Sequence, residues 1–213
     1  MRKIDLESWP RRKHFEVYRQ FDFPHFNLTF PVTVTNFRKW VRARGNSLSL
    51  ATTYLLARVA NETPPFRLRI RGEEVIEHEI VHPSFTVLLE NELFSFCTVE
   101  YRADYDAFIA ASKRRIQEVR AHPTLEDEPG QDDLLFMTSL PWFHFTSIMH
   151  PIHMHPVDSV PRIAWGRIDA EADRFEMPLS VQVHHALMDG LHVGRYAERA
   201  QQLFNNPQDL LKA

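Results

Sequence analysis

The sequence has little cysteine and no long apolar run. Cys97 is the one cysteine among 213 residues, which excludes a disulfide within one chain and is typical of a reducing compartment. No segment approaches the ~20 apolar residues that a membrane span requires, and residues 1–5 lack the apolar stretch of a signal peptide. We therefore expect a cytoplasmic protein that has no membrane as a partner.

An excess of charge of either sign is also missing. The 25 lysines and arginines nearly balance 28 aspartates and glutamates, which gives a net charge of −3. Such a chain has no basic field to hold a nucleic-acid backbone, so nucleic acid is not expected as a partner. With 44% hydrophobic and 25% charged residues, the composition is that of an ordinary folded protein. We expect one domain over residues 1–213.

The periodicity of the chain changes irregularly between strand and helix, without internal repeats or linkers. Alternating apolar and polar residues predict strands over 25–35, 66–70, 75–76, 84–89, 93–100, 133–138, 142–149, 161–168 and 175–184. Helical spacing predicts helices over 11–20, 35–41, 47–59, 104–120 and 190–203. Cys97 falls in a strand-like run and is expected to be a small buried residue. This order favours an α+β layer sandwich over regular βαβ winding.

The most informative stretch is residues 179–190. Its alternation places on one face of a strand Leu179, Val181, Val183 and His185. The opposite face then holds Ser180, Gln182 and His184. Immediately afterwards the period changes, and Asp189 can cap a helix that opens at Gly190. The chain thus brings the imidazole of His185 to a strand end beside a helix start.

An imidazole that is half sunk among apolar neighbours stays neutral and can keep one ring nitrogen free to accept a proton. By that reasoning His185 is a candidate general base. The alternative is a core histidine whose two ring nitrogens are both occupied by hydrogen bonds. The residues alone leave both interpretations open.

Residues 184–190 read HHALMDG. This motif resembles the catalytic signature of the chloramphenicol acetyltransferase family, whose HHxxxDG pattern also occurs in other CoA-dependent acyltransferases and in peptide condensation domains. The flanking residues 178–183 and 192–195 resemble the chloramphenicol-type branch. The resemblance implies a two-layer α+β sandwich in which helices flank a mixed, mainly antiparallel sheet. It also implies a homotrimer with the active site at the subunit boundary.

Two further segments carry the resemblance. Around Trp9 and Pro10, Arg11 matches a family arginine that pairs with the signature aspartate, here Asp189. After Pro141 and Trp142, Ser147 matches a family serine that stabilises an oxyanion. Without the resemblance, Arg11 would be taken for a solvated charge and Ser147 for an ordinary polar strand residue.

The resemblance implies acetyl transfer from acetyl-CoA to a hydroxyl of a small molecule, with chloramphenicol as one candidate acceptor. His185 would be the general base, and Ser147 of a neighbouring chain would stabilise the tetrahedral oxyanion. Asp189 and Arg11 would support the site structurally. Tyr18 and Phe26 would keep the aromatic character of the acceptor pocket, and no metal is expected.

Several residues depart from the family pattern. Ala164 stands in the place of a threonine that helps to bind the transition state, and Ile168 and Ser49 stand where tyrosines usually approach CoA. Pro24 replaces a small residue of the acceptor pocket. These departures bear on the acceptor and the rate. They also leave open a second class of function, a ligand-binding homologue that has lost turnover.

A third class of function would rest on the histidine density of residues 144–158. Neutral imidazoles at such spacing could hold zinc or copper, and the candidate ligands are His144, His150, His153, His155 and Asp158. The absence of a recognised ligand spacing favours a histidine-rich surface loop instead. Acidic residues 126–128, with Asp132 and Asp133, could form a carboxylate site, but a solvated loop is favoured there too.

Overall fold

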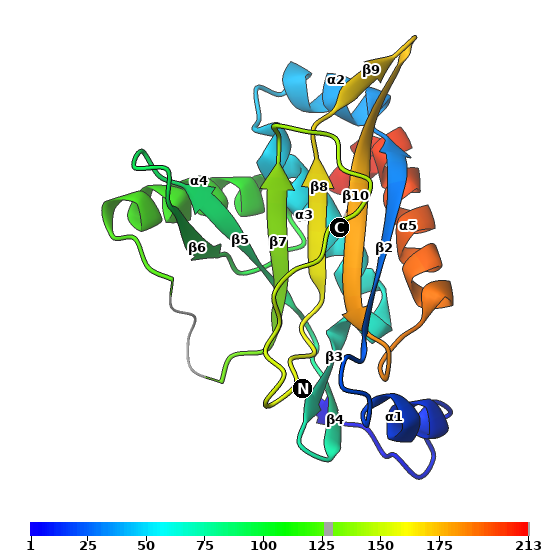
Figure 1. Cartoon of the computed structure of the whole chain (residues 1–213). Coiled ribbons are helices and arrows are strands. Elements are labelled where there is room, and N and C mark those ends of the chain that lie inside the picture. The colour runs from blue at the N-terminus through cyan, green and yellow to red at the C-terminus, as the bar shows by residue number, and fades with distance from the viewer. Residues whose placement is uncertain (126–129, 213) are drawn as a thin grey trace.

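The computed structural model describes residues 1–125 and 130–212, and a large mixed sheet forms its centre (Figure 1). The strand order is β2-β10-β8-β7-β5-β6, and β9 also pairs with β10. Their bounds are β2 His25–Thr33, β5 His82–Leu88, β6 Phe94–Thr98, β7 Leu134–Leu140, β8 Arg162–Gly166, β9 Asp169–Glu171 and β10 Arg174–His184. Only β7 pairs in parallel, with β5 and β8, whereas the other pairs are antiparallel. The expected mixed, mainly antiparallel sheet is confirmed.

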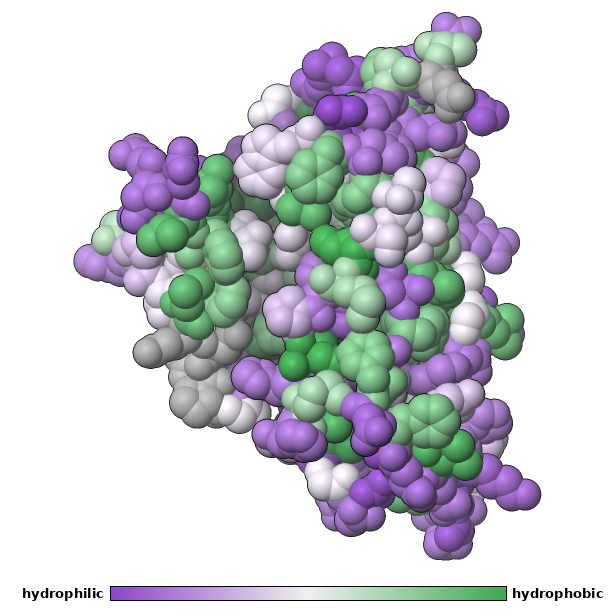
Figure 2. Space-filling view, viewed as in Figure 1, coloured by the Kyte–Doolittle hydropathy of each residue, from purple (hydrophilic) through white to green (hydrophobic). Residues whose placement is uncertain are grey.

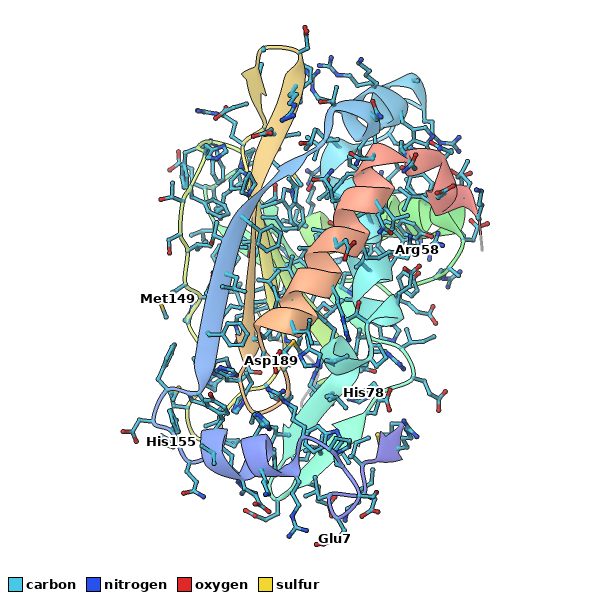
Figure 3. The ribbon with its side chains drawn as sticks, turned by 90° about the vertical axis from the view of Figure 1, so that its right-hand side faces the viewer. Glu7, Arg58, His78, Met149, His155 and Asp189 are labelled. Carbon is cyan, nitrogen blue, oxygen red and sulfur yellow. The ribbon has the colours of Figure 1, made fainter. Side chains whose placement is uncertain are left out.

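Helices α2 to α5 pack on one face of this sheet, and α1 lies at one end of the molecule (Figures 1 and 3). The elements are α1 Arg12–Tyr18, α2 Thr35–Ala43, α3 Leu48–Glu62, α4 Tyr105–Ala121 and α5 Gly190–Asn205, with short 3₁₀ turns at Pro64–Arg67 and Pro207–Leu211. The starts of α3, α4 and α5 follow capping rules. Ser47 Oγ accepts a hydrogen bond from Leu50 N, and Asp104 Oδ1 accepts one from Ala107 N at 2.7 Å. All five predicted helices are therefore present.

A second, three-stranded sheet lies beside α1 at one end of the molecule (Figure 1). It consists of β1 Arg2–Lys3, β3 Leu68–Arg71 and β4 Glu74–Glu77, in the order β1-β4-β3. The expected hairpin turns at Gly72, whose φ of +59° favours glycine. β1 did not follow from the sequence pattern.

The main core lies between the helices and the large sheet. Residues of α3 and of the strands are fully buried there, including Tyr54, Leu55, Val181, Val183 and Cys97. Burial raises the pKa of the Cys97 thiol to about 11, so the thiol stays protonated near neutral pH. Cys97 is therefore the small buried residue that the sequence predicted.

The large sheet is covered on its other face as well, and here two predictions were wrong. Residues 142–149 do not form a strand. In 141–161, all of which the structure describes, there is no helix and only an isolated bridge between Met154 and Val157. Both sides of β7 are already paired, to β5 and β8, so the chain that leaves Leu140 finds no free edge there. We call residues 141–161 the covering loop.

The covering loop also explains the second correction. The alternation predicted a half-buried strand, yet β10 is buried on both faces. Ser180, Gln182 and His184 are only 1–2% exposed. Figure 3 shows why, because Met149 of the covering loop lies on one side of the sheet and α5 on the other. The polar residues of β10 therefore face the covering loop instead of solvent.

Candidate active site

The turn that leaves β10 joins the large sheet to α5 within a few residues. Leu187 N and Met188 N both donate hydrogen bonds to His184 O, at 3.0 and 3.3 Å. Asp189 then caps α5, because its Oδ1 accepts a hydrogen bond from Leu191 N at 3.1 Å. His192, to which sequence reasoning gave no role, places Nδ1 2.9 Å from the same Oδ1. The predicted passage from strand to capped helix is present, and we call residues 184–189 the signature turn.

His185 lies half-buried in this turn, and its ring has one committed nitrogen. Its Nδ1 is 3.1 Å from Met188 O. Because a carbonyl oxygen can only accept, Nδ1 must carry the hydrogen and donate it. A neutral ring then has its lone pair on Nε2, which has no hydrogen-bond partner within 1–125 and 130–212. The structure thus favours an available base over a histidine with both nitrogens occupied.

Two aromatic rings enclose the imidazole. The Tyr18 ring stacks on it with centroids 4.0 Å apart and an angle of 13° between the planes, and the Phe26 ring lies tilted at 4.7 Å. Tyr18 ends α1, whereas Phe26 belongs to the edge strand β2. The two residues predicted for the acceptor pocket therefore both contact His185. They fix the plane of its ring and keep water from one of its faces.

Arg11 holds the signature turn from outside. Its Nη1 donates to Asp189 Oδ2 at 2.7 Å, its Nη2 to His185 O at 2.8 Å and its Nε to Ala186 O at 3.0 Å. The side chain is 12% exposed, so it is not the solvated charge that the sequence alone suggested. We call these three hydrogen bonds the Arg11 clamp.

The clamp also sets the charge of Asp189. Burial acts to raise the pKa of this carboxyl group, but the Arg11 hydrogen bond and the nearby His192 outweigh burial and lower the pKa to about 2. The carboxylate is therefore ionised near neutral pH, with both oxygens engaged. A carboxylate in this state is poorly suited to act as a base, which fits the supporting position predicted for Asp189.

His184 differs sharply from its neighbour His185. It is 2% exposed, its Nδ1 accepts a hydrogen bond from Ala186 N at 3.2 Å, and its ring meets the ring of His25 edge-on at 4.9 Å. Burial, followed by the neighbouring His25, lowers the pKa of His184 to about 3. It is therefore a neutral structural residue. Sequence reasoning gave it no role, although the polar row that it ends was visible in the pattern.

Ser147 lies exposed in the covering loop, not on a strand as predicted. No contact joins it to His185 within the described part of the chain. The covering loop is bound to Gln182 on one face of β10, whereas the His185 ring contacts Phe26, which pairs with Val183 of the opposite row. One chain therefore does not assemble the predicted pair by itself.

The residues that depart from the family pattern are placed as follows. Ala164 is fully buried on β8, opposite Ser180 of β10. Ile168 is half-buried, and Ser49 is exposed on α3. Pro24 accepts the backbone hydrogen bond from His185 N at 2.7 Å. Pro24 therefore helps to hold the backbone of His185, which the sequence could not show.

The candidate ligands of the histidine-rich stretch, residues 144–158, do not gather in the structure. His144 Nδ1 lies 3.4 Å from Asp169, and His150 is held by its backbone to Gln182. Asp158 pairs instead with Arg162. Within 1–125 and 130–212, no group of three or more His, Cys, Asp or Glu residues could hold a metal ion. His144, His150 and Asp158 thus bind separate partners and do not converge on one point.

The acidic stretch is only partly described. Residues 126–128 lie outside the described residues. Asp132 is not a solvated loop residue, because Arg71 binds both of its oxygens, at 2.6 and 2.8 Å, and His78 Nε2 lies 2.8 Å from Oδ1.

None of the helices in the described ranges is long and apolar enough to cross a membrane.

The sequence is similar to those of known proteins. A family model described as chloramphenicol acetyltransferase matches residues 1–201. Chloramphenicol acetyltransferase 3 of Escherichia coli is 32% identical over 206 residues, which are 96% of this chain and 97% of the relative. Chloramphenicol acetyltransferase 2 of Haemophilus influenzae is 31% identical, with the same coverage of both chains.

Solved structures agree on the fold. A chloramphenicol acetyltransferase structure superposes with a TM-score of 0.83 at 24% identity and covers 95% of this chain and 100% of its own. A dihydrolipoamide acetyltransferase of Azotobacter vinelandii superposes with a TM-score of 0.69 at 16% identity and covers 93% of this chain and 88% of its own.

Replacing Arg11 tests the clamp. Arg11→Ala removes three hydrogen bonds from the signature turn, two of them to backbone carbonyls, and should lower the free energy of unfolding by about 2 kcal/mol. Arg12→Ala is the matched control, because Arg12 is the next residue and pairs only with the exposed Glu7 and Glu16. It should cost less than about 1 kcal/mol. Urea unfolding measures both, and equal losses would contradict the clamp.

The buried His184 predicts a dependence of stability on acid. Its folded pKa of about 3 lies below the ordinary 6.5, so the unfolded chain takes up a proton first as the pH falls. The stability from neutral His184 is thus present above pH 6.5 and is lost between about pH 6.5 and 3, by up to ~1.4 kcal/mol per pH unit.

His184→Asn keeps a hydrogen-bond acceptor and should flatten that slope, measured by urea unfolding from pH 7 to pH 4.5. Ser180→Ala, from the same buried row and without a titratable group, should keep the wild-type slope. A His184→Asn variant that loses stability as steeply as the wild type would contradict the buried neutral imidazole.

Proposed function

The chain belongs to the chloramphenicol acetyltransferase family, and we propose that it transfers an acetyl group from acetyl-CoA to a hydroxyl of a small molecule. The observation that carries this proposal is the state of the His185 ring. Nδ1 is committed to Met188 O, and Nε2 is left with its lone pair beside Tyr18 and Phe26. A base needs this arrangement, because a fixed tautomer presents one basic nitrogen in one direction.

In the proposed reaction, His185 Nε2 takes the proton from the acceptor hydroxyl while the hydroxyl oxygen attacks the carbonyl carbon of the acetyl thioester. The carbonyl oxygen becomes the oxyanion of a tetrahedral intermediate. When the intermediate collapses, the carbon–sulfur bond breaks and the CoA thiolate recovers the proton from the imidazolium. The products are the acetyl ester and CoA, and no acyl-enzyme forms.

The neighbours of His185 match what this cycle demands. The ring must gain and lose one proton without turning, and the stacked Tyr18 and the Nδ1–H···O=C bond oppose rotation. The imidazolium that forms is stabilised because Met188 O accepts from Nδ1–H in both protonation states. The Arg11 clamp holds the backbone of the turn, so the ring is carried on a fixed support. Arg11 and Asp189 thus position the base and take no part in proton transfer.

Ser147 completes the site in this proposal by donating a hydrogen bond to the oxyanion, and it comes from a second copy of the chain in a homotrimer. Two observations support a second copy. Ser147 and His185 do not meet within one chain, and large apolar side chains near Ser147 are exposed. Trp142, Phe143 and Met149 are 59%, 50% and 61% exposed. Figure 2 shows apolar residues spread over this face of the molecule.

The acceptor is a small hydroxylated compound that packs against Tyr18 and Phe26. Chloramphenicol is one candidate acceptor, since the relatives are named for it. The departures at Ala164, Ile168 and Ser49 bear on the identity of the acceptor. In this proposal residues 1–213 form one domain. The enzyme is cytoplasmic and uses no metal. A binding protein that has lost turnover is the second candidate, and Ala164 favours it, because the family threonine at this position helps to bind the transition state.

Release of the CoA thiol from acetyl-CoA, measured with chloramphenicol and a panel of other alcohols, tests the proposal. His185→Ala should abolish release while the protein stays folded, because it removes the only proposed base. Ser147→Ala should lower kcat by roughly 100-fold with little change in the KM of the acceptor, since one oxyanion donor is lost. His14→Ala, an exposed histidine of α1, serves as the control and should behave like the wild type.

Unchanged turnover in His185→Ala would reject the mechanism. Binding of an acceptor without any thiol release by the wild type would identify the protein as the non-catalytic homologue.

A further inference from the structure

The covering loop has no ladder of backbone hydrogen bonds along most of its length, so side chains must fix its position. Its first part rests on the end of β8. Arg167 N donates to Phe143 O at 3.0 Å, and the buried Phe145 packs so closely on Gly166 that an added Cβ would come within 3.2 Å of its ring. This contact fixes the chain two residues before Ser147.

The middle of the covering loop is held by a single amide. Gln182 Oε1 accepts a hydrogen bond from His150 N at 2.8 Å, and Gln182 Nε2 donates one to His150 O at 3.3 Å. The side chain thus pairs with both backbone groups of one residue. Gln182 is 1% exposed, and an unpaired amide or peptide group at that depth would be costly. The pair therefore fixes both the place and the orientation of residue 150.

The last part of the covering loop is tied to the neighbouring position of the same face. Arg162, opposite Gln182 in the pairing of β8 with β10, binds Asp158 and donates to Val160 O at 2.9 Å. His25 Nε2 lies 2.8 Å from Asp158 O. The end of the covering loop is thus held independently of Gln182, and loss of Gln182 should release only its middle.

Ser147 lies between the Phe145 and His150 contacts, three residues from the second. Three residues span at most roughly 10 Å, so Ser147 cannot lie farther than that from residue 150, and releasing residue 150 frees Ser147 to move on one side. Ser147 itself is exposed and lies on no regular element. The direction of its hydroxyl therefore depends on the two flanking contacts, and of these only the Gln182 amide pairs with the backbone by hydrogen bonds from a side chain.

We infer that Gln182 is a positioning residue for the proposed oxyanion donor: its buried amide holds the backbone of His150 and thereby sets where Ser147 Oγ points. This inference rests on the function proposed for Ser147. β10 would then serve the same reaction twice. The strand ends beside His185, and Gln182 on its polar face anchors the loop that carries Ser147 to the neighbouring site. A misplacement on the order of 1 Å can cost up to about 100-fold in rate, which makes such an anchor consequential.

Hydrogen exchange and kinetics on the full-length protein test the inference together. Gln182→Met keeps the length of the side chain and loses both polar atoms, and Gln182→Asn is a milder change whose shorter amide no longer reaches His150. In either variant, exchange of backbone amides in a peptide spanning residues 143–152 should accelerate at least about tenfold. Ser180→Ala is the matched control, because Ser180 lies in the same row, is equally buried and bonds Asn27 instead of the loop.

With acetyl-CoA and an accepted alcohol, Gln182→Met should lower kcat about 10- to 100-fold and leave the KM of the acceptor within about twofold. If Gln182→Met acted through a general loss of structure or a displaced His185, its effect on kcat would multiply with the effect of Ser147→Ala. If it acts only by misplacing the Ser147 hydroxyl, it has no further effect once that hydroxyl is gone. The double variant Gln182→Met/Ser147→Ala should therefore be no slower than Ser147→Ala alone. Ser180→Ala should keep wild-type kcat.

Multiplying effects of the two substitutions, or unchanged exchange in both Gln182 variants, would overturn the inference. If the wild type releases no thiol with any acceptor, the proposed function fails and the positioning role fails with it. Accelerated exchange would in that case still show that Gln182 anchors the loop, so the two failures are distinguishable.

Discussion

The three hydrogen bonds of Arg11 to the signature turn are the constraint on which the site depends. They come from a residue 174 to 178 positions away in the chain and act on two backbone carbonyls and one carboxylate at once. A guanidinium is suited to this because its donors lie in one rigid plane and stay charged at any physiological pH. Since His185 O is among the acceptors, the guanidinium acts directly on the residue that carries the proposed base. The turn therefore does not rely on its own short hydrogen bonds alone.

The two faces of β10 divide the work of the molecule between them. One row packs into the main core with Leu179, Val181 and Val183, and gives the strand its place. The opposite row is polar yet fully buried, and its members have different partners. Ser180 bonds Asn27 of β2, Gln182 pairs with the backbone of His150 in the covering loop, and His184 accepts a hydrogen bond from Ala186 N. Polar groups buried in this way are stabilising only when each finds a partner, so the Gln182 amide favours one position of residue 150. The strand that ends beside the proposed base thus also holds the middle of the covering loop.

Local physics made much of the site predictable from the sequence, and non-local packing limited the rest. The strand that ends near His185, the Asp189 cap and the helix from Gly190 follow from periods and capping rules that act over a few residues. Arg11 could be connected to Asp189 only through the family resemblance, because nothing local distinguishes it from Arg12. The covering loop was mistaken for a strand at 142–149, since alternation shows what a segment could do but not whether a free sheet edge awaits it. For the same reason the pattern could show that Gln182 and His184 share one face of the strand, but not that the covering loop buries that face.

The covering loop is anchored to the sheet on one side and exposes apolar side chains on the other, which suits it to contact a partner chain. Gln182 and Arg162 hold the covering loop from the sheet side, and Phe145 of the loop packs on Gly166. Trp142, Phe143 and Met149 of the same loop have half or more of their surface exposed. In the proposed homotrimer, association would then not have to supply the conformational entropy of ordering the loop. The same rigidity matters for chemistry, because an oxyanion donor contributes most when its direction is set in advance. Anchoring within one chain is thus what would allow a site shared between two chains to be precise.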